Sequence, residues 1–366
     1  MKKIEFSLFQ KFRNKNVIVT GHTGFKGSWL SCWLVLLGAK VIGLSINIPS
    51  NPSHFNAINL KKKIIHQKID IRNLKVLKKT FKKYQPDYVF HLAAQSLVRR
   101  SYSDPVFTWE TNTIGTLNVL ESLKVLKKNC AAVLITSDKS YKNLEIKRGY
   151  KEDDILGGKD PYSASKASAE LAIQSHISSF FPLKKTKVII GVARAGNVIG
   201  GGDWSENRLI PDCVKSWSKN KKALIRNPKS TRPWQHVLEA VSGYLLLALK
   251  LKKNKKLHGE VFNFGPNNTK NYNVIFLVNL IQKFWKETSY KVLNRRKQSF
   301  HESNLLKLNS SKAKKKLKWK CILSFTETIS MVAHWYKNYY FRTKKMFEVS
   351  SDQIQKYEKL LKKRSI

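Results

Sequence analysis

The 366-residue chain has little acidic charge, few cysteines and no long apolar run. Its 24 Asp and Glu residues stand against 69 Lys and Arg, which gives a formal net charge of +45. No stretch approaches the roughly twenty apolar residues that a membrane-spanning helix requires, so no membrane span is expected. Residues 1–16 lack the apolar core of a secretion signal, and we therefore expect a cytoplasmic protein.

The four cysteines, Cys32, Cys130, Cys213 and Cys321, stand far apart in the chain. They form no CxxC motif and no cluster with histidine, so neither a disulfide framework nor a metal site is predicted. Reduced thiols packed in the interior of a cytosolic protein are the expected state.

The excess of positive charge suggests a nucleic-acid partner, because basic surfaces attract phosphates and release counterions. The lysines, however, occur in short runs along the whole chain, mostly on the polar side of helical patterns. The chain contains no helix-turn-helix, zinc-finger or RNA-binding aromatic motif. Its 42% hydrophobic residues exclude a disordered polycation. We predict no nucleic-acid function, and a basic binding protein without catalysis remains the alternative from a different class.

Strand-like apolar runs alternate with helical patterns in the first half, which predicts a doubly wound parallel sheet of the Rossmann type in an α/β protein. Six strands are expected at 16–21, 40–44, 64–71, 88–93, 131–136 and 187–193, and helices at 28–37, 105–128, 161–181 and 237–251. Residues 1–195 should form the sheet domain, together with a returning segment of about 234–264. Residues 196–366 should form mainly a smaller C-terminal lobe. The last two dozen residues are basic and weakly patterned, which predicts a frayed end.

Gly21, Gly24 and Gly27 follow the first strand and open the first helix with the spacing GxxGxxG. Such glycines allow a tight turn, a close backbone approach to a pyrophosphate and close packing of helix on strand. Dinucleotide binding is favoured over an ordinary strand-to-helix turn. The second strand is followed by Ser45-Ile46-Asn47, with neither an acid for the ribose hydroxyls nor an arginine for a 2′-phosphate. NAD is therefore favoured over NADP without being decided.

Two further strand ends supply candidate cofactor contacts. Asp70 and Ile71 follow the third strand and could bracket the adenine, although an aspartate in a turn is an equally good interpretation of Asp70. Ala93, Ala94 and Gln95 follow the fourth strand, where small residues let the backbone pass close to a cofactor.

Tyr162 and Lys166 are four residues apart, on one face of a helix that Asp160 would cap and Pro161 would open. A neighbouring ammonium favours the phenolate form of a tyrosine, which makes the pair a candidate base. Ser137, after the fifth strand, could hydrogen-bond a substrate hydroxyl beside Tyr162.

Asp138 and Lys139 follow Ser137 directly. Elimination of water requires both an acid and a base, whereas a simple hydride transfer requires neither at this position. The alternative is a solvated Asp-Lys turn.

Together these motifs resemble the extended short-chain dehydrogenase/reductases and, among them, the CDP-glucose 4,6-dehydratase family. The resemblance spans residues 16 to about 270 and weakens in the lysine-rich C-terminal third. It is carried by GHTGFKGSWL (21–30), HLAAQSLVRRSY (91–102), TSDKSY (136–141), DPYSASKASAE (160–170), ARAGNVIGGGDW (193–204), RLIPD (208–212) and RPWQHVLE (232–239).

The resemblance implies a hydro-lyase that converts CDP-glucose to CDP-4-dehydro-6-deoxyglucose with bound NAD. Tyr162, helped by Lys166 and Ser137, would deprotonate the C4 hydroxyl. Lys139 would take the C5 proton, unless it stays charged and stabilises the enolate, and Asp138 would protonate the departing C6 hydroxyl. An epimerase, reductase or dehydratase of another nucleotide sugar is the same-fold alternative.

The resemblance also assigns binding residues and an assembly. The cofactor would contact Gly21, Thr23, Gly24, Phe25, Lys26, Gly27, Asp70, Ile71, Ala93, Ala94, Gln95, Tyr162 and Lys166. The nucleotide-sugar-binding lobe would use Asn197, Arg208, Arg226 and Arg232, because arginine matches phosphate geometry. A homodimer or homotetramer is implied, and deoxysugars for O-antigen or lipopolysaccharide are the natural products.

Overall fold

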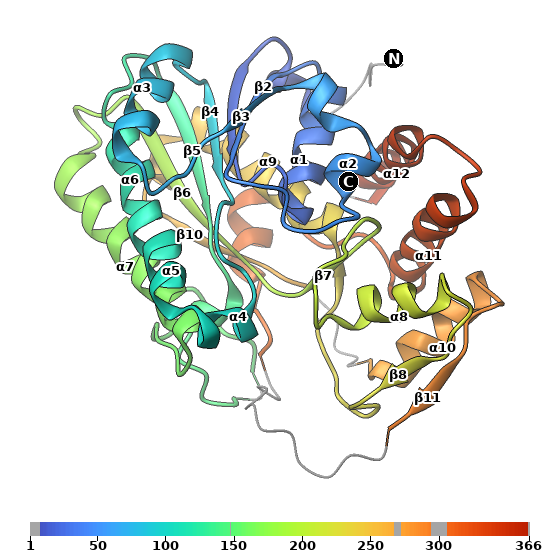
Figure 1. The fold of residues 1–366 in the computed structure, drawn as a ribbon. Helices are drawn as coiled ribbons and strands as arrows, with labels where there is room; N and C mark the ends of the chain where they lie inside the picture. Colours follow the sequence, from blue (N-terminus) through green and yellow to red (C-terminus); the bar gives the residue numbers. More distant parts are fainter. Residues whose placement is uncertain (1–7, 147, 267–271, 294–305, 365–366) are drawn as a thin grey trace.

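A seven-stranded parallel sheet forms the centre of the protein (Figure 1). The computed structural model describes residues 8–146, 148–266, 272–293 and 306–364. The strand order is β10-β6-β5-β4-β1-β2-β3, with bounds β1 Asn16–Thr20, β2 Lys40–Ser45, β3 Ile65–Lys68, β4 Tyr88–His91, β5 Cys130–Ile135, β6 Val188–Ala195 and β10 Val261–Phe264. The Rossmann-type sheet predicted from the sequence is confirmed.

The prediction of six strands was one short. The seventh, β10, pairs with β6 although 65 residues separate them, from Ala195 to Val261. β3 and β4 are equally short, so length does not explain the omission. β10 lies far along the chain from the other strands, and its pairing with β6 makes it part of the sheet. The third strand is also shorter than predicted, at Ile65–Lys68.

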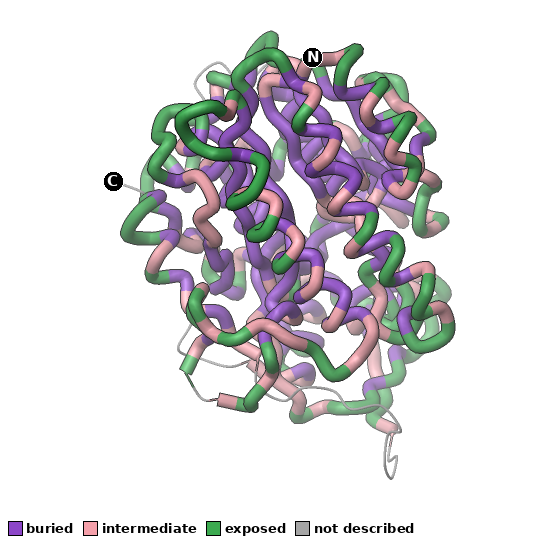
Figure 2. The backbone as a smooth tube through the Cα atoms, turned by 90° about the vertical axis from the view of Figure 1, so that its left-hand side faces the viewer, coloured by how far each residue is buried: buried purple, intermediate pink, exposed green. Residues whose placement is uncertain are grey.

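Helices cover both faces of the sheet. Successive side chains along each strand point to opposite faces, so they pack alternately against the two layers of helices. In β1, Val17 and Val19 join a core cluster with Trp29, while Ile18 joins a separate cluster with Leu120 on the other face. Figure 2 shows this buried interior between exposed outer segments. One face carries α3 Leu74–Tyr84, α5 Pro105–Trp109, α6 Gly115–Leu123 and α7 Pro161–Phe180. The other carries α1 Phe25–Leu36 and α9 Val237–Lys253, and α12 Met346–Arg364 packs against α1.

The single helix predicted over 105–128 is interrupted and shorter. Between α5 and α6 lies a π-helical turn, Glu110–Ile114, and α6 ends at Leu123. The turn coincides with Asn112, whose buried amide accepts from Gln95 N (2.8 Å) and donates to Ser165 Oγ (2.9 Å). Such turns are frequent at functional sites, and this one connects the loop after β4 to α7.

The remaining elements group below and beside the sheet in Figure 1. Two short parallel pairs, β7 with β9 and β8 with β11, belong to this part. The bounds are α2 His54–Ala57, α4 Val98–Ser103, β7 Val198–Ile199, α8 Leu209–Trp217, β8 Ala223–Ile225, β9 Gln235–His236, α10 Val274–Phe284, β11 Tyr290–Val292 and α11 Phe325–Phe341. Short 3₁₀ turns lie at Gln10–Phe12, Leu60–Lys63, Asp138–Ser140 and Lys255–Leu257, and a second π turn at Ala313–Leu317.

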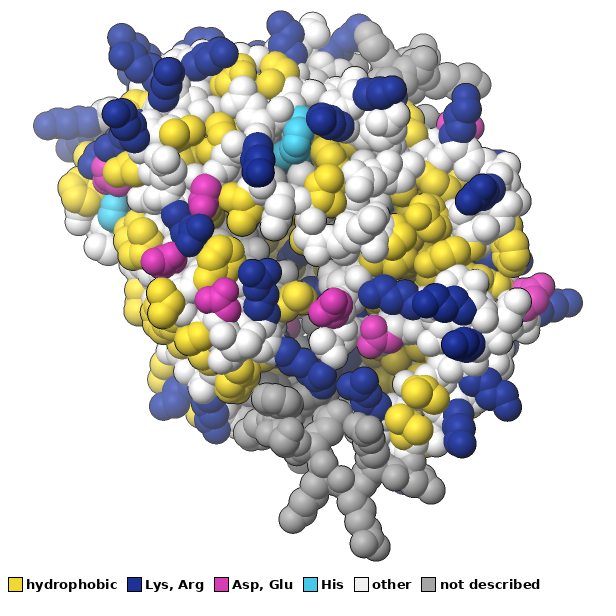
Figure 3. All heavy atoms as spheres, in the orientation of Figure 1, with side chains coloured by type: hydrophobic (Ala, Val, Ile, Leu, Met, Phe, Trp, Pro, Cys, Tyr) yellow, Lys and Arg dark blue, Asp and Glu magenta, His cyan; other side chains and the backbone are white. Residues whose placement is uncertain are grey.

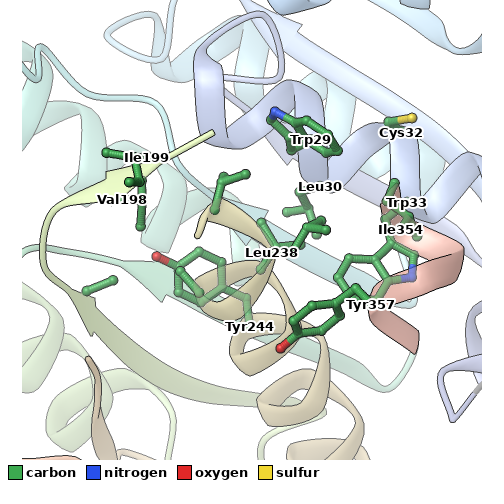
Figure 4. Packing of buried hydrophobic residues seen from close by; sticks show 14 of the residues in the cluster. Trp29, Leu30, Cys32, Trp33, Val198, Ile199, Leu238, Tyr244, Ile354 and Tyr357 are labelled. Atoms are coloured by element: carbon green, nitrogen blue, oxygen red, sulfur yellow. The ribbon is translucent and has the colours of Figure 1, made fainter. Parts of the chain in front are cut away.

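The predicted frayed C-terminus was wrong. Residues 346–364 form α12, which packs against α1 in the main core (Figure 4). Ile354 and Tyr357 are fully buried, and Trp33 Nε1 donates to Glu358 Oε1 at 2.5 Å. The lysines occupy the outer side of this helix, so the sparse apolar positions still form one continuous buried face.

Glu239 on α9 helps to hold this C-terminal part in place. Its carboxylate accepts from the backbone N–H groups of Ile322 (2.9 Å) and Leu323 (2.7 Å) and from Tyr357 OH (2.6 Å). The side chain is buried, and burial raises the pKa of Glu239 to about 7.

Glu239→Gln is expected to change the pH dependence of stability. The folded protein holds the Glu239 proton more tightly than the unfolded chain, whose pKa is about 4.5. The stabilisation from this proton is complete below pH 4.5 and is lost as the pH rises through about 7, a change of about 3 kcal/mol. Denaturant unfolding at pH 5 and pH 8 should show the wild type losing stability relative to the variant. An equal difference between the two proteins at both pH values would contradict this.

The surface carries the charge excess. Figure 3 shows Lys and Arg side chains dispersed over the visible face rather than gathered in one stripe. All four cysteines are free thiols, and three of them are buried. Among the described residues, no helix combines the length and apolar composition needed to cross a bilayer.

Candidate active site

The carboxyl ends of β1, β4, β5 and β6 meet at one edge of the sheet, because these strands are parallel neighbours. The glycine turn follows β1, Ala93 follows β4, Ser137 follows β5 and Asn197 follows β6. The structure therefore gathers the main predicted motifs at the edge where ligands bind in this class of sheet.

The glycine turn leaves no room for side chains at two positions. Gly21 has φ +73°, and a Cβ there would lie 2.7 Å from Ala93 N. A Cβ on Gly27 would lie 2.1 Å from Gly21 O. α1 begins at Phe25, and its N-cap Gly24 provides no side-chain cap, so the first amides of the helix are left for another acceptor, as an anion-binding helix start requires. A cradle of this shape fits a pyrophosphate.

The end of β2 is built from neutral groups. Thr23 Oγ1 donates to Asn47 O (2.7 Å), and Ser45 Oγ lies 3.1 Å from Nδ1 of the buried His22. His22 Nε2 in turn lies 2.7 Å from His66 Nδ1. Burial, with the charge of His66, lowers the pKa of His22 to about 4, so this ring is neutral at pH 7. Among the described groups at the end of β2, the atoms that could hydrogen-bond a ribose are therefore neutral.

Several predicted cofactor residues are engaged within the protein. Asp70 pairs with Arg72 at 2.8 Å, and Ile71 is buried. Ala93 N donates to Thr20 Oγ1 (3.2 Å), and the buried Gln95 donates to Thr108 Oγ1 (3.0 Å). Of these residues, Ala93 lies against the glycine turn.

Tyr162 and Lys166 lie in the first turns of α7, both buried. The helix begins as predicted, since Asp160 accepts from Ser163 N (2.9 Å) and Pro161 occupies the first turn. Burial raises the pKa of Tyr162 to about 12, while a hydrogen bond with the Ser137 side chain opposes this. Burial lowers the pKa of Lys166 to about 8, and Lys166 Nζ lies 3.5 Å from Ile135 O.

Asp138 is a buried carboxyl that acts electrostatically on Tyr162. Ser137 Oγ donates to its Oδ1 (2.9 Å), and burial raises the pKa of Asp138 against the pull of Lys139 and Ser137. A carboxyl that keeps its proton more easily is suited to act as an acid. Lys139 is only partly buried.

Lys26 lies closer to the catalytic residues than the sequence indicated. Its Nζ approaches Tyr244 OH on α9 (3.5 Å), and its charge acts on Lys166 and Asp138. Burial and the charges of Lys166 and Arg208 lower the pKa of Lys26 to about 8. A lysine in the first turn of a helix is unfavourable, because its charge opposes the helix dipole. This unusual position is the feature of the sequence that could have indicated a special role for Lys26.

The four predicted substrate residues all follow β6 in the chain. Arg208 pairs with Asp203 (3.0 Å) and acts electrostatically on Tyr162, which brings it to the catalytic residues. Arg226 and Arg99 both act on Asp212 of α8, so Arg99 joins this group although the sequence did not single it out. Arg99 also donates to Asn207 Oδ1 (2.8 Å). Asn197 is exposed after β6, and Arg232 precedes β9.

Figure 3 shows a hollow near the centre of the view, bordered by basic and acidic side chains. Asn112 is a further residue of this region that the sequence interpretation missed, because the π turn that directs it inward arises from tertiary packing. Among the described residues, no group of three or more His, Cys, Asp and Glu side chains is arranged to hold a metal ion.

The sheet, the glycine cradle and the Tyr162–Lys166 pair define an extended short-chain dehydrogenase/reductase. The chain belongs to the GDP-mannose 4,6-dehydratase family, whose sequence model matches residues 18–332. It is 43% identical to the CDP-glucose 4,6-dehydratase of Salmonella typhimurium strain LT2, over 89% of this chain and 91% of that protein. It is 29% identical to a dTDP-glucose 4,6-dehydratase of Haemophilus influenzae, over 69% of this chain and 75% of that protein.

Solved structures share the fold. An epimerase of Methanothermobacter thermautotrophicus superposes with a TM-score of 0.76 at 26% identity, covering 92% of this chain and 96% of that one. The dTDP-glucose 4,6-dehydratase of Bacillus anthracis in complex with NAD gives 0.71 at 23% identity, covering 88% and 97%.

Proposed function

We propose that the protein dehydrates CDP-glucose to CDP-4-dehydro-6-deoxyglucose with tightly held NAD. The observation that carries this proposal is the buried acid Asp138 beside the Tyr162–Lys166 pair, since an epimerase or a reductase needs no acid there. The 43% identity to a CDP-glucose 4,6-dehydratase supports the substrate, and the dehydratase and epimerase relatives support the reaction class.

The residues present fit NAD. The cradle of Gly21, Gly24 and Gly27 excludes side chains where a pyrophosphate must approach the backbone, with Thr23, Phe25 and Lys26 around it. Asp70, Ile71 and the segment 93–95 would line the adenine and ribose side. The absence of an arginine in Ser45-Ile46-Asn47 supports NAD over NADP. Relatives of the same fold bind NAD, among them the Bacillus anthracis dehydratase.

When bound, NAD would supply the acceptor for the C4 hydride of the glucose and the donor of a hydride to C6. Tyr162 takes the proton of the C4 hydroxyl, with its phenol oriented by Ser137 and its phenolate favoured by the Lys166 ammonium. Asp138 donates a proton to the leaving C6 hydroxyl, and Lys139 takes the proton from C5 when its amine is in the neutral form. Lys26 adds positive charge beside Asp138 and Lys166.

The nucleotide end of the substrate would lie against residues 196–366, where Asn197, Arg208, Arg226 and Arg232 would contact the diphosphate and the cytidine ribose. Arg208 supports this placement, because it links the Asp203 region to Tyr162. Residues 1–195 with 234–264 would then form the NAD-binding domain. The four free thiols are typical of a cytoplasmic protein. The product would serve deoxysugar synthesis for surface polysaccharides such as O-antigen.

A homodimer fits the exposed apolar side chains on neighbouring helices of one face. Val106 on α5 is 68% exposed, and Leu171 and Phe180 on α7 are 56% and 50% exposed. Apolar side chains grouped in this way typically mark a protein interface. A homotetramer would require a second contact surface.

The test is incubation of the purified protein with NAD⁺ and, separately, CDP-, dTDP-, UDP- and GDP-glucose. We expect mass spectrometry to show loss of one water from CDP-glucose and formation of a 4-keto sugar. Turnover of a different nucleotide sugar alone would contradict the substrate, and turnover of none would contradict the function.

A further inference from the structure

Glu170 on α7 and Arg194 on β6 form a buried ion pair close to the catalytic residues, since Glu170 contacts Thr136 and follows Lys166 by one helical turn. Each side chain is 1% exposed. Arg194 Nε donates to both carboxylate oxygens of Glu170 (2.9 and 2.8 Å), and Arg194 Nη2 donates to Oε2 (2.5 Å). This is a bidentate contact in an interior position.

The pair is costly for stability alone. Burying two charges carries a desolvation penalty that their attraction often fails to repay, and apolar replacements of similar volume are frequently no less stable. The pair therefore has a role beyond stability, and the residues that its remaining hydrogen bonds contact indicate that role.

Those remaining hydrogen bonds contact residues on both sides of the turn that carries Ser137, Asp138 and Lys139. Thr136 Oγ1 donates to Glu170 Oε1 (2.6 Å), and Arg194 Nη1 donates to Tyr141 OH (2.6 Å). Thr136 directly precedes Ser137, and Tyr141 comes two residues after Lys139. The guanidinium also lies 4.5 Å from the centre of the Tyr141 ring. One ion pair therefore holds the turn of Ser137, Asp138 and Lys139 from both sides. We call this pair, with its contacts to Thr136 and Tyr141, the clamp.

The Tyr141 end is anchored further. Its hydroxyl donates to Asn263 Oδ1 of β10 (2.8 Å), and Asn263 Nδ2 donates to Tyr150 O (2.8 Å). Arg194 Nη1 also donates to Glu152 O (3.0 Å). The clamp is therefore fixed to the edge strand of the sheet.

The same carboxylate also acts on Lys166. Glu170 lies one helical turn after Lys166 on α7, and its charge raises the pKa of Lys166 against burial. The other groups that face Lys166 are the cation Lys26 and the buried, neutral His91, together with the carbonyl of Ile135. Among these described groups, only Glu170 favours the ammonium by charge.

We propose that Glu170 and Arg194 are positioning residues for the dehydration: they hold the Ser137–Lys139 turn in place, and Glu170 follows Lys166 by one turn along α7. The proposal rests on the proposed function. Its first consequence is geometric, since misplacing a catalytic group by about 1 Å lowers turnover by about 100-fold. Its second consequence is that the lysine loses its proton at lower pH without Glu170.

The experiment compares Glu170→Gln with Glu239→Gln, an identical change at an equally buried carboxylate on α9. Glu170→Gln should lower kcat for CDP-glucose by about 100-fold with KM little changed, and should move the alkaline limb of the kcat–pH profile to lower pH. Glu239→Gln should leave both unchanged. A Glu170→Gln enzyme with wild-type kcat and the wild-type alkaline limb would overturn the proposal.

Glu170→Gln leaves Arg194 as an unpaired buried charge, which is strongly destabilising. The double variant Glu170→Gln/Arg194→Met removes both charges and should fold, with the same loss of kcat and the same pH shift. Hydrogen exchange without substrate should show faster exchange at the amides of Lys139, Ser140 and Tyr141, which bond within this turn. Unchanged exchange there would also overturn the proposal. A wild-type protein that turns over no nucleotide sugar would instead contradict the proposed function, and the exchange measurement would still decide the clamp.

Discussion

Tyr162→Phe is expected to lower formation of the 4-keto product from CDP-glucose by about 10²- to 10⁴-fold, the usual contribution of a positioned acid–base group. The phenol is buried at the start of α7, next to Ser137 and Asp138. Phenylalanine keeps the ring and its packing but cannot take the C4 proton. Product formation by mass spectrometry and the absorbance of reduced nicotinamide in a single turnover measure the loss.

The control is Tyr88→Phe, another buried tyrosine, at the amino end of β4 and away from the catalytic edge. It should retain full activity. In Tyr162→Phe no reduced nicotinamide should accumulate, because the first step itself is blocked. Near-wild-type turnover in this variant would exclude Tyr162 as the base.

Asp138→Asn should lower product formation by a similar factor, about 10²- to 10⁴-fold, but at a later step. Asparagine can still accept the Ser137 hydrogen bond, yet it has no acidic proton for the departing C6 hydroxyl. Oxidation at C4 should continue, so reduced nicotinamide should accumulate in a single turnover. This accumulation separates Asp138→Asn from Tyr162→Phe.

Asp87→Asn is the matched control, since Asp87 lies before β4 at the opposite edge and accepts from Asn16 N (3.1 Å). It should not accumulate reduced nicotinamide. If Asp138→Asn dehydrates CDP-glucose at the wild-type rate, Asp138 is not the acid. If it loses turnover without any accumulation, Asp138 acts already in the oxidation.

The protonation of Lys166 depends on pH and on Glu170, so it connects the expected effects at Tyr162 with the clamp. A lysine whose pKa is lowered to about 8 is only partly charged in mildly alkaline solution, so its surroundings control how much active enzyme is present. Glu170 acts on this balance from the same helix, one turn away. Lys26 and Lys166 oppose each other's charge, and Asp138 offsets part of that repulsion at Lys26.

The sequence by itself determined the parts of the protein that depend on local pattern. Strict glycine spacing after an apolar strand, a Tyr–Lys pair at helical spacing after an Asp-Pro start, and alternating strands and helices predict the cradle, the start of α7 and the parallel sheet. These features follow from backbone sterics and periodicity, which need no knowledge of distant residues.

Only the tertiary structure decided the features that join distant segments. β10 is a strand because β6 offers it a pairing edge, and α12 is ordered because α1 presents an apolar face to it. The π turn at Asn112, the approach of Lys26 to Asp138 and Lys166, and the clamp from Glu170 and Arg194 to Thr136 and Tyr141 all arise across the sheet edge. Burial and pairing between elements far apart in the chain set these contacts and the pKa values that depend on them, and no local pattern encodes either.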